Sequence, residues 1–237
     1  MVAYRKRLAV NGKAPYLGPF PGLVECSDVA TLSGTSVFVS LTSKCRHLEK
    51  LSDHHQIERM HCPYREDLID ILARFPNLKH LQLRLPRSPE IAPLAQLTQI
   101  ESLVLKCSKH QKSLDFLQGM ANLRFLCVSE AMGIDRLTPL GSLSSLQELY
   151  IDGTISGRNT VQTLAPLGKL HSLEYLLLLI RVAKQRRTLK PLYKLTKLAF
   201  LHLSDDYVAT EYNAILRKLP LLDEICFNGG KRHTLNN

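Results

Sequence analysis

The segment from residue 45 to residue 63, "CRHLEKLSDHHQIERMHCP", holds the densest group of histidines and cysteines in the chain. Imidazole nitrogen and thiolate sulfur are the ligands that zinc prefers, so this segment is the first candidate for metal chemistry. Its spacing matches no familiar zinc finger. Cys62 and His54 instead fit the spacing of the neighbouring apolar residues, so burial in a core explains why both residues occur there. The sequence therefore predicts no metal site.

Other catalytic patterns are not seen in the sequence. It contains no glycine-rich phosphate loop, no nucleophile elbow and no motif of paired carboxylates. The glycines occupy turns, as in "DGTISG" at residues 152–157. We therefore expect a protein that is not an enzyme and that needs no cofactor.

Basic residues suggest a second kind of chemistry, the binding of anions. The chain has 31 lysines and arginines against 21 acids, a net charge of +10, and nucleic acid is a possible partner on that ground. Much of the excess lies near the two ends of the chain and in "RVAKQRRTLKPLYKLTK" at residues 181–197. Four residues of that segment form a possible site for phosphate or an acidic protein: Lys184, Arg186, Arg187 and Lys190.

A repeated pattern must position all of these residues. Seven segments place apolar residues three, three and then two apart, and their second apolar residues follow one another at steps of 22, 23, 23, 27, 25 and 24 residues. Such a period is typical of a solenoid. The seven segments are "FPNLKHLQL", "LTQIESLVL", "MANLRFLCV", "LSSLQELYI", "LHSLEYLLL", "LTKLAFLHL" and "LPLLDEICF", beginning at residues 75, 97, 120, 143, 170, 195 and 219.

Each repeat combines two structural periods. Its last part alternates like a strand, with apolar residues two apart. Upstream of most of these parts stands a proline-containing segment, as in "LTPLGSL" at 137–143 and "LAPLGKL" at 164–170. Proline is tolerated in a tight return turn or a 3₁₀ piece, because its missing N–H is not needed by a strand ladder there. One repeat therefore predicts a short strand followed by a tight return.

This pattern resembles the leucine-rich repeat family, whose core is L-x-x-L-x-L, over at least residues 72–230. The proline-containing segments look like those of short internalin-like or SDS22-like repeats. The resemblance implies an α/β fold. The expected architecture is a solenoid with a curved parallel β-sheet on the concave side and 3₁₀, short helical or irregular segments on the convex side. The asparagine that many such repeats carry three residues after the last apolar position is missing here, so loop backbone groups need other partners.

We expect one solenoid bounded by two caps. Residues 1–45 are predicted to form an N-terminal cap and residues 46–230 the repeats, about seven clear and one or two degenerate. One degenerate repeat places Ile57, Met60 and Cys62 in the core, and residues 35–42 alternate like a strand. Residues 231–237 form a polar C-terminal tail.

The residues between the inward leucines should lie on the concave face, because side chains alternate along a strand. In the middle repeats these positions are apolar or aromatic. A patch of that kind is typical of a protein-contact surface, whereas loops or a terminal cap folding over it is the alternative. The residues predicted to bind a protein partner are Phe125, Cys127, Tyr150, Asp152, Tyr175, Leu177, Ile180, Phe200 and His202. Since the basic cluster maps away from these aromatics, nucleic acid is disfavoured.

Charge and cysteine usage complete the expectations. Outward basic residues gather near the N-terminal end (Arg59, Lys79, Arg84, Lys106, Arg124) and acids in the C-terminal half, so the face should be polarised.

Six cysteines without paired spacing fit free thiols, and neither a signal peptide nor a membrane span is seen. We expect a cytoplasmic adaptor or regulatory scaffold. An inhibitor or immunity-type protein that blocks a partner enzyme is the alternative, and the oligomeric state stays open.

Overall fold

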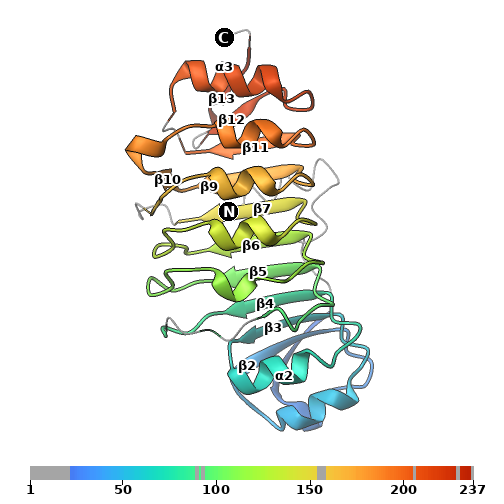
Figure 1. Cartoon of the computed structure of the whole chain (residues 1–237). Coiled ribbons are helices and arrows are strands. Elements are labelled where there is room, and N and C mark those ends of the chain that lie inside the picture. The colour runs from blue at the N-terminus through green and yellow to red at the C-terminus, as the bar shows by residue number, and fades with distance from the viewer. Residues whose placement is uncertain are drawn as a thin grey trace.

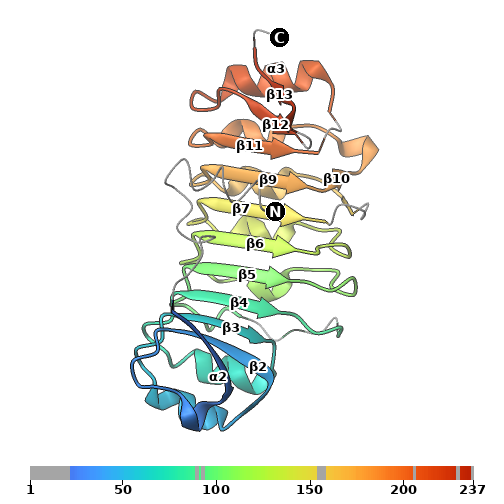
Figure 2. The same cartoon turned by 180° about the vertical axis from the view of Figure 1, so that it is seen from behind.

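A long sheet organises the chain in a computed structural model, which describes residues 22–88, 91, 94–153, 159–204, 207–227 and 230–235. Within these residues eleven strands form one sheet in the order β1-β2-β3-β4-β5-β6-β7-β9-β11-β12-β13, stacked along an elongated molecule (Figures 1 and 2). The strands are β1 (Leu23–Asp28), β2 (Phe38–Arg46), β3 (Arg59–Pro63), β4 (His80–Arg84), β5 (Ser102–Lys106), β6 (Phe125–Ser129), β7 (Glu148–Asp152), β9 (Tyr175–Leu179), β11 (Phe200–Leu203), β12 (Ile225–Phe227) and β13 (Arg232–His233).

The repeats pair in parallel and in register. Leu81 of β4 lies opposite Leu103 of β5, which lies opposite Leu126 of β6, and the same column continues through β7, β9 and β11. These inward leucines are at most 2 % exposed. They join one continuous core with the leucines of the return segments. The predicted solenoid with a parallel sheet is therefore confirmed.

Short 3₁₀ helices form several of the return segments on the side of the core opposite the sheet, where Figure 1 shows them in front of the strands. Three of them carry proline in their first turn, as expected where an N–H is not required. Neighbouring returns approach closely, since a Cβ on Gly168 would lie 2.6 Å from the carbonyl oxygen of Pro191. The 3₁₀ helices are η1 (Val29–Thr31), η2 (Leu48–Asp53), η3 (Asp115–Leu117), η4 (Thr138–Ser142), η5 (Ala165–Lys169), η6 (Lys184–Arg186) and η7 (Lys190–Lys194).

Longer helices stand near the two ends of the described stack. Helix α2 (Glu66–Leu72) follows β3, and α3 (Ala209–Lys218) precedes β12 (Figure 1). Tyr212 of α3 packs its ring 5.0 Å from that of Phe227. Strand β13 then pairs antiparallel with β12, so part of the expected polar tail belongs to the sheet. A second, two-stranded sheet joins β8 (Thr160–Val161) to β10 (Arg181–Val182).

The N-terminal strands belong to the same sheet as the repeats. Strands β1 and β2 pair in parallel with each other, and β2 pairs with β3. Met60 and Cys62 of β3 are buried in the core, as the degenerate repeat predicts. The first 21 residues of the expected N-terminal cap lie outside the described residues, and the cap boundary at residue 45 stays a prediction.

Loop carbonyls accept hydrogen bonds from side chains at a repeat position other than that of the missing asparagine. The side-chain amides of Asn77, Gln99 and Asn122 donate to the carbonyl oxygens of His55, Leu72 and Thr98 at 3.0, 2.8 and 2.7 Å. Each amide stands one residue before the second apolar residue of its repeat. These side-chain hydrogen bonds therefore connect each coil to the preceding one, just before the strand begins. No helix among the described residues has the length and apolar character to cross a membrane.

Candidate protein-binding face

Two columns of outward residues run across the sheet as the sequence predicts. In the first column Phe125 lies opposite Glu148, which lies opposite Tyr175. In the second, Cys127 lies opposite Tyr150, which lies opposite Leu177. We call the sheet face that carries these columns the concave face; it is the face turned toward the viewer in Figure 2.

A second apolar cluster occupies this face, separate from the core. Its centre consists of Phe125, Tyr150, Tyr175 and Leu177, which are 0, 3, 8 and 5 % exposed. Half-buried side chains pack around this centre: Val104, Cys127, Leu179 and Phe200. We call these eight residues the concave cluster. Strands β6, β7 and β9 are therefore buried on both faces, and the centre of the cluster is not an open patch.

One predicted member lies elsewhere. Ile180 is 4 % exposed and belongs to the main core, not to the concave cluster. The reason is strand parity: Leu176 and Leu178 point inward, so residue 180 points inward too. Leu179, which is not among the predicted binding residues, takes the outward place. Counting outward positions in steps of two from Tyr175 finds it.

A carboxyl group is buried within the concave cluster. Glu148 is 6 % exposed and stands between Phe125 and Tyr175 in its column. The hydroxyl of Tyr150 donates to Oε2 of Glu148 at 2.8 Å. Burial, opposed by this hydrogen bond and reinforced by the nearby charge of Glu174, raises the pKa of Glu148 to about 7. The centre of the face thus carries an acid whose pKa is shifted from its ordinary value toward neutral pH.

Partly exposed residues frame the buried centre. The ring of Phe200 stacks against that of Tyr175 at 6.0 Å and lies 6.5 Å from the ring of His202. Phe200, His202 and Cys127 are half-buried, and so is Asp152 at the end of β7. The structure therefore brings eight of the nine predicted binding residues onto one face. Four form the buried centre and four form what we call the rim.

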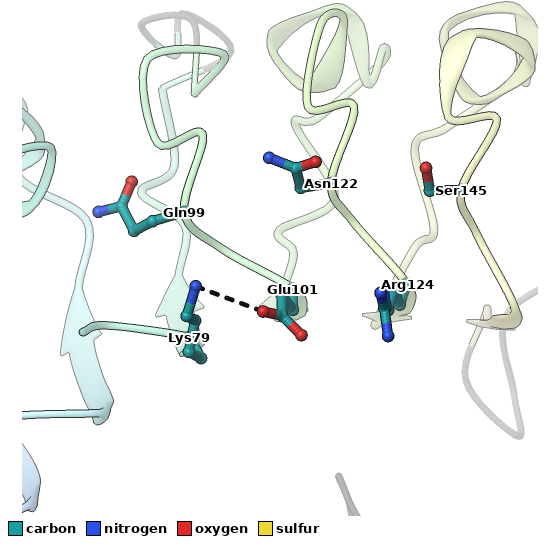
Figure 3. Close-up of a pocket in the computed structure, with 6 residues that line it drawn as sticks. All are labelled: Lys79, Gln99, Glu101, Asn122, Arg124 and Ser145. Atoms are coloured by element: carbon teal, nitrogen blue, oxygen red, sulfur yellow. Dashed lines mark ion pairs between the residues drawn. The ribbon is translucent and has the colours of Figure 1, made fainter. Parts of the chain in front are cut away.

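The expected charge gradient is weakened by local pairing. Lys79 contacts Glu101 at 3.3 Å and Lys106 contacts Glu130 at 2.9 Å. Figure 3 shows the first pair in a polar pocket, which is lined by Lys79, Gln99, Glu101, Asn122, Arg124 and Ser145. These residues occupy the same two repeat positions in successive coils. The pocket is consequently a product of the repeat period and shows no arrangement specific to a ligand.

The basic residues of segment 181–197 lie off the concave face. Lys184 and Arg186 belong to η6, and Lys190 begins η7 in a return segment. Lys184, Arg186 and Lys190 are exposed, whereas Arg187 is half-buried. Glu211 of α3 approaches this loop and accepts a hydrogen bond from the backbone N–H of Leu189 at 2.8 Å. The structure thus separates the basic residues from the aromatic residues.

The histidine- and cysteine-rich segment is distributed over several elements. Cys62 is buried in the core, where burial raises the pKa of its thiol to about 12. His54 is also buried, and its Nδ1 lies 3.3 Å from Nε2 of Gln56. Among the residues that the structure describes, no group of three histidines, cysteines or acids is placed to hold a metal ion.

Solved structures with a similar fold support this architecture. An internalin of Listeria monocytogenes, internalin F, superposes with a TM-score of 0.52 at 21 % identity over 80 % of this chain and 52 % of its own. Internalin C2 of the same organism gives 0.52 at 22 % identity, over 76 % of this chain and 75 % of its own. The chain spans about half of the internalin F chain. No protein-family model matches the chain, and no curated protein sequence matches it. Repeat pattern, sheet and structural likeness together assign the chain the leucine-rich repeat fold.

Proposed function

We propose that the protein is a non-catalytic binding module that docks a protein partner on its concave face. The observation that carries the proposal is the concave cluster, a second apolar cluster on the sheet face that points away from the core. Burial of the four central residues already contributes to the stability of the fold, whereas the half-buried rim leaves aromatic and polar groups within reach of a partner. Aromatic residues concentrated at the centre of a patch, with polar residues around them, are typical of protein-contact hot spots.

The rim is the part of this face that a partner would contact first. Phe200, His202 and Cys127 are half-buried and flank the buried Tyr150 and Tyr175. The strands that carry these residues pair in parallel with a neighbour on both sides. A rigid sheet presents such side chains without an ordering cost on binding, which favours affinity.

The finer role that we propose is that of a cytoplasmic adaptor or regulatory scaffold. The six cysteines are all free, which fits a reducing compartment. An inhibitor that blocks a partner enzyme uses the same face, and it differs by abolishing an activity in a tight one-to-one complex. We propose no catalysis by this chain, because a buried acid and its tyrosine partner are held among apolar side chains instead of opening into a substrate cleft.

The experiment that tests the proposal is photo-crosslinking from two positions of the full chain. A benzophenone amino acid replaces Phe200 on the concave face in one variant and Gln118 on an exposed convex turn in the other. We expect a protein adduct from native lysate with position 200 and not with position 118. Equal labelling from both positions contradicts the proposal. Retention of nucleic acid through Lys184, Arg186 and Lys190, with steep salt dependence, also contradicts it and supports the polyanion alternative.

A further inference from the structure

Two cysteines that are 19 residues apart in the chain meet between the first two strands of the sheet. Sγ of Cys26 in β1 lies 3.8 Å from Sγ of Cys45 in β2. Both thiols are buried, at 3 and 6 % exposure. Sequence spacing gave no indication of this pair. The sulfur atoms come together because the register of β1 against β2 shifts between Cys26 and Asp28.

The geometry is close to that of a disulfide. Sulfur atoms in a disulfide are about 2.05 Å apart, so the two thiols would have to approach by roughly 2 Å. Across the register shift Cys26 pairs with Leu41 and Asp28 pairs with Arg46, so Cys45 lies beside the residue that follows Cys26. Because both cysteines stand on strands that are already paired, the remaining approach of the two sulfur atoms is a short movement of the two side chains and the adjoining backbone.

The surrounding contacts show what such a bond would reinforce. Asp28 at the end of β1 forms an ion pair with Arg46 at 2.9 Å and lies 2.7 Å from Nδ1 of His47. Arg46 and His47 directly follow Cys45 in the chain. These contacts hold the end of β1 to the end of β2. Strand β1 needs such support, because it is the edge strand of the described sheet and its Leu23 and Val24 are 45 and 38 % exposed.

We propose that Cys26 and Cys45 form an oxidation site that closes to a reversible disulfide by exchange with a low-molecular-weight disulfide. One thiolate attacks a sulfur of the small disulfide, forms a mixed disulfide and releases the first small thiol. The other cysteine attacks the protein sulfur of the mixed disulfide and releases the second. Two protein thiols lose two electrons, the small disulfide gains them, and the two S–H protons end on the two released thiols.

Thiol acidity sets the rate of this exchange. Burial, together with the neighbouring Cys26 and Asp28, raises the pKa of Cys45 to about 11. Since the thiolate is the attacking species, closure that starts at Cys45 is slow at neutral pH and speeds up about tenfold for each pH unit. An exposed thiol, with an ordinary pKa of about 8.5, reaches half of its maximal rate near pH 8.5.

The test uses the full chain and oxidised glutathione as the small disulfide. After incubation between pH 7 and pH 10 and alkylation of free thiols, mass spectrometry of the digest follows the peptides that contain Cys26 and Cys45. We expect a cross-link between these two peptides, a loss of two hydrogen atoms in mass, a rate that climbs through pH 9, and reversal by dithiothreitol. The melting temperature should rise on oxidation and return on reduction.

Two variants keep the result interpretable. Cys62→Ala removes a buried thiol of the neighbouring strand β3, and it should leave the cross-link intact. Cys26→Ser should abolish the cross-link and the oxidative rise in melting temperature, and its circular dichroism reports whether it is folded. The proposal is overturned if both cysteines of the wild type stay alkylatable, if each carries only a glutathione adduct, or if the cross-link joins other cysteines.

Discussion

The hydroxyl of Tyr150 donates a hydrogen bond of 2.8 Å to the carboxylate of Glu148, and the two residues are 3 and 6 % exposed on the concave face of β7. An acid in such a place costs free energy when it ionises, because burial removes water from its charged form. The pair therefore links the stability of the fold to pH, and it marks the centre of the face that we propose to bind a partner.

The first prediction concerns the pH dependence of stability. The pKa of Glu148 is raised from 4.5 to about 7 in the folded chain, so the folded state keeps a proton that the unfolded state has lost between these values. Its contribution to stability is complete below about pH 4.5, falls as pH rises and levels out above about pH 7. In Glu148→Gln this loss is absent. The free energy of unfolding of the variant should therefore rise relative to that of the wild type by roughly 2 to 3 kcal/mol between pH 5 and pH 8.

Urea unfolding of both proteins at the two pH values measures this gain. Glu49→Gln, a change at an exposed acid of η2 outside the concave cluster, is the control, and its free energy of unfolding should differ from that of the wild type by nearly the same amount at both pH values. If the free energies of unfolding of the wild type and Glu148→Gln differ by the same amount at both pH values, the buried ionisable carboxyl group is contradicted.

The second prediction separates the inward residues from exposed ones. Leu149→Ala empties a core position that is 0 % exposed, and it should lower the free energy of unfolding by about 2 to 5 kcal/mol. Leu221→Ala, at a leucine that is 55 % exposed, should change it by less than about 0.5 kcal/mol. Denaturant titration gives both values. Equal costs at the two positions would show that the inward assignment of β7 is wrong.

The third prediction concerns the junction of β1 and β2. The hydrogen bond with His47, the backbone N–H of Ala30 and the charge of Arg46 together lower the pKa of Asp28 despite its burial. A lowered pKa contributes stability above the ordinary value near 3.9, and this contribution is lost as pH falls through the folded value. Asp28→Asn should therefore lower the melting temperature at pH 7, and the difference from wild type should shrink below pH 4.

A matched change at an exposed ion pair tests whether position matters. Asp67, whose side chain is 60 % exposed, pairs with Arg65 at the start of α2. Asp67→Asn should have a much smaller effect at pH 7, because exposed pairs contribute little. If Asp67→Asn costs as much as Asp28→Asn, the contacts between β1 and β2 have no special weight.

The fourth prediction addresses the packing of the return segments. In Gly168→Ala the new Cβ would stand 2.6 Å from the carbonyl oxygen of Pro191, so one coil has to move away from the next. We expect a loss of about 1 to 3 kcal/mol. At Gly34 no neighbouring atom would lie within 4 Å of the new Cβ, so Gly34→Ala should leave the free energy of unfolding nearly unchanged. Thermal unfolding of the two variants distinguishes close packing of the coils from a loose stack.

The repeat pattern was sufficient to predict the fold and the register. Leu149 inward and Tyr150 outward follow from a period of two, and their columns agree with the strand pairing. The same rule was misapplied at Ile180, where a one-residue error in parity moved a core residue onto the face. Contacts between distant residues could not be predicted in this way, because the meeting of Cys26 with Cys45 depends on a shifted register that no local spacing shows.

The measurement that tests the central claim most directly is the affinity of the crosslinked partner for the wild type and for two folded variants. Phe200→Asp places a charge on the rim of the concave face, and Gln118→Asp adds the same charge on a convex turn. We predict that Phe200→Asp weakens binding at least about tenfold, a cost of about 1.4 kcal/mol, while Gln118→Asp binds like the wild type. Unchanged affinity of Phe200→Asp, or equal loss in both variants, would contradict a docking site on the concave face.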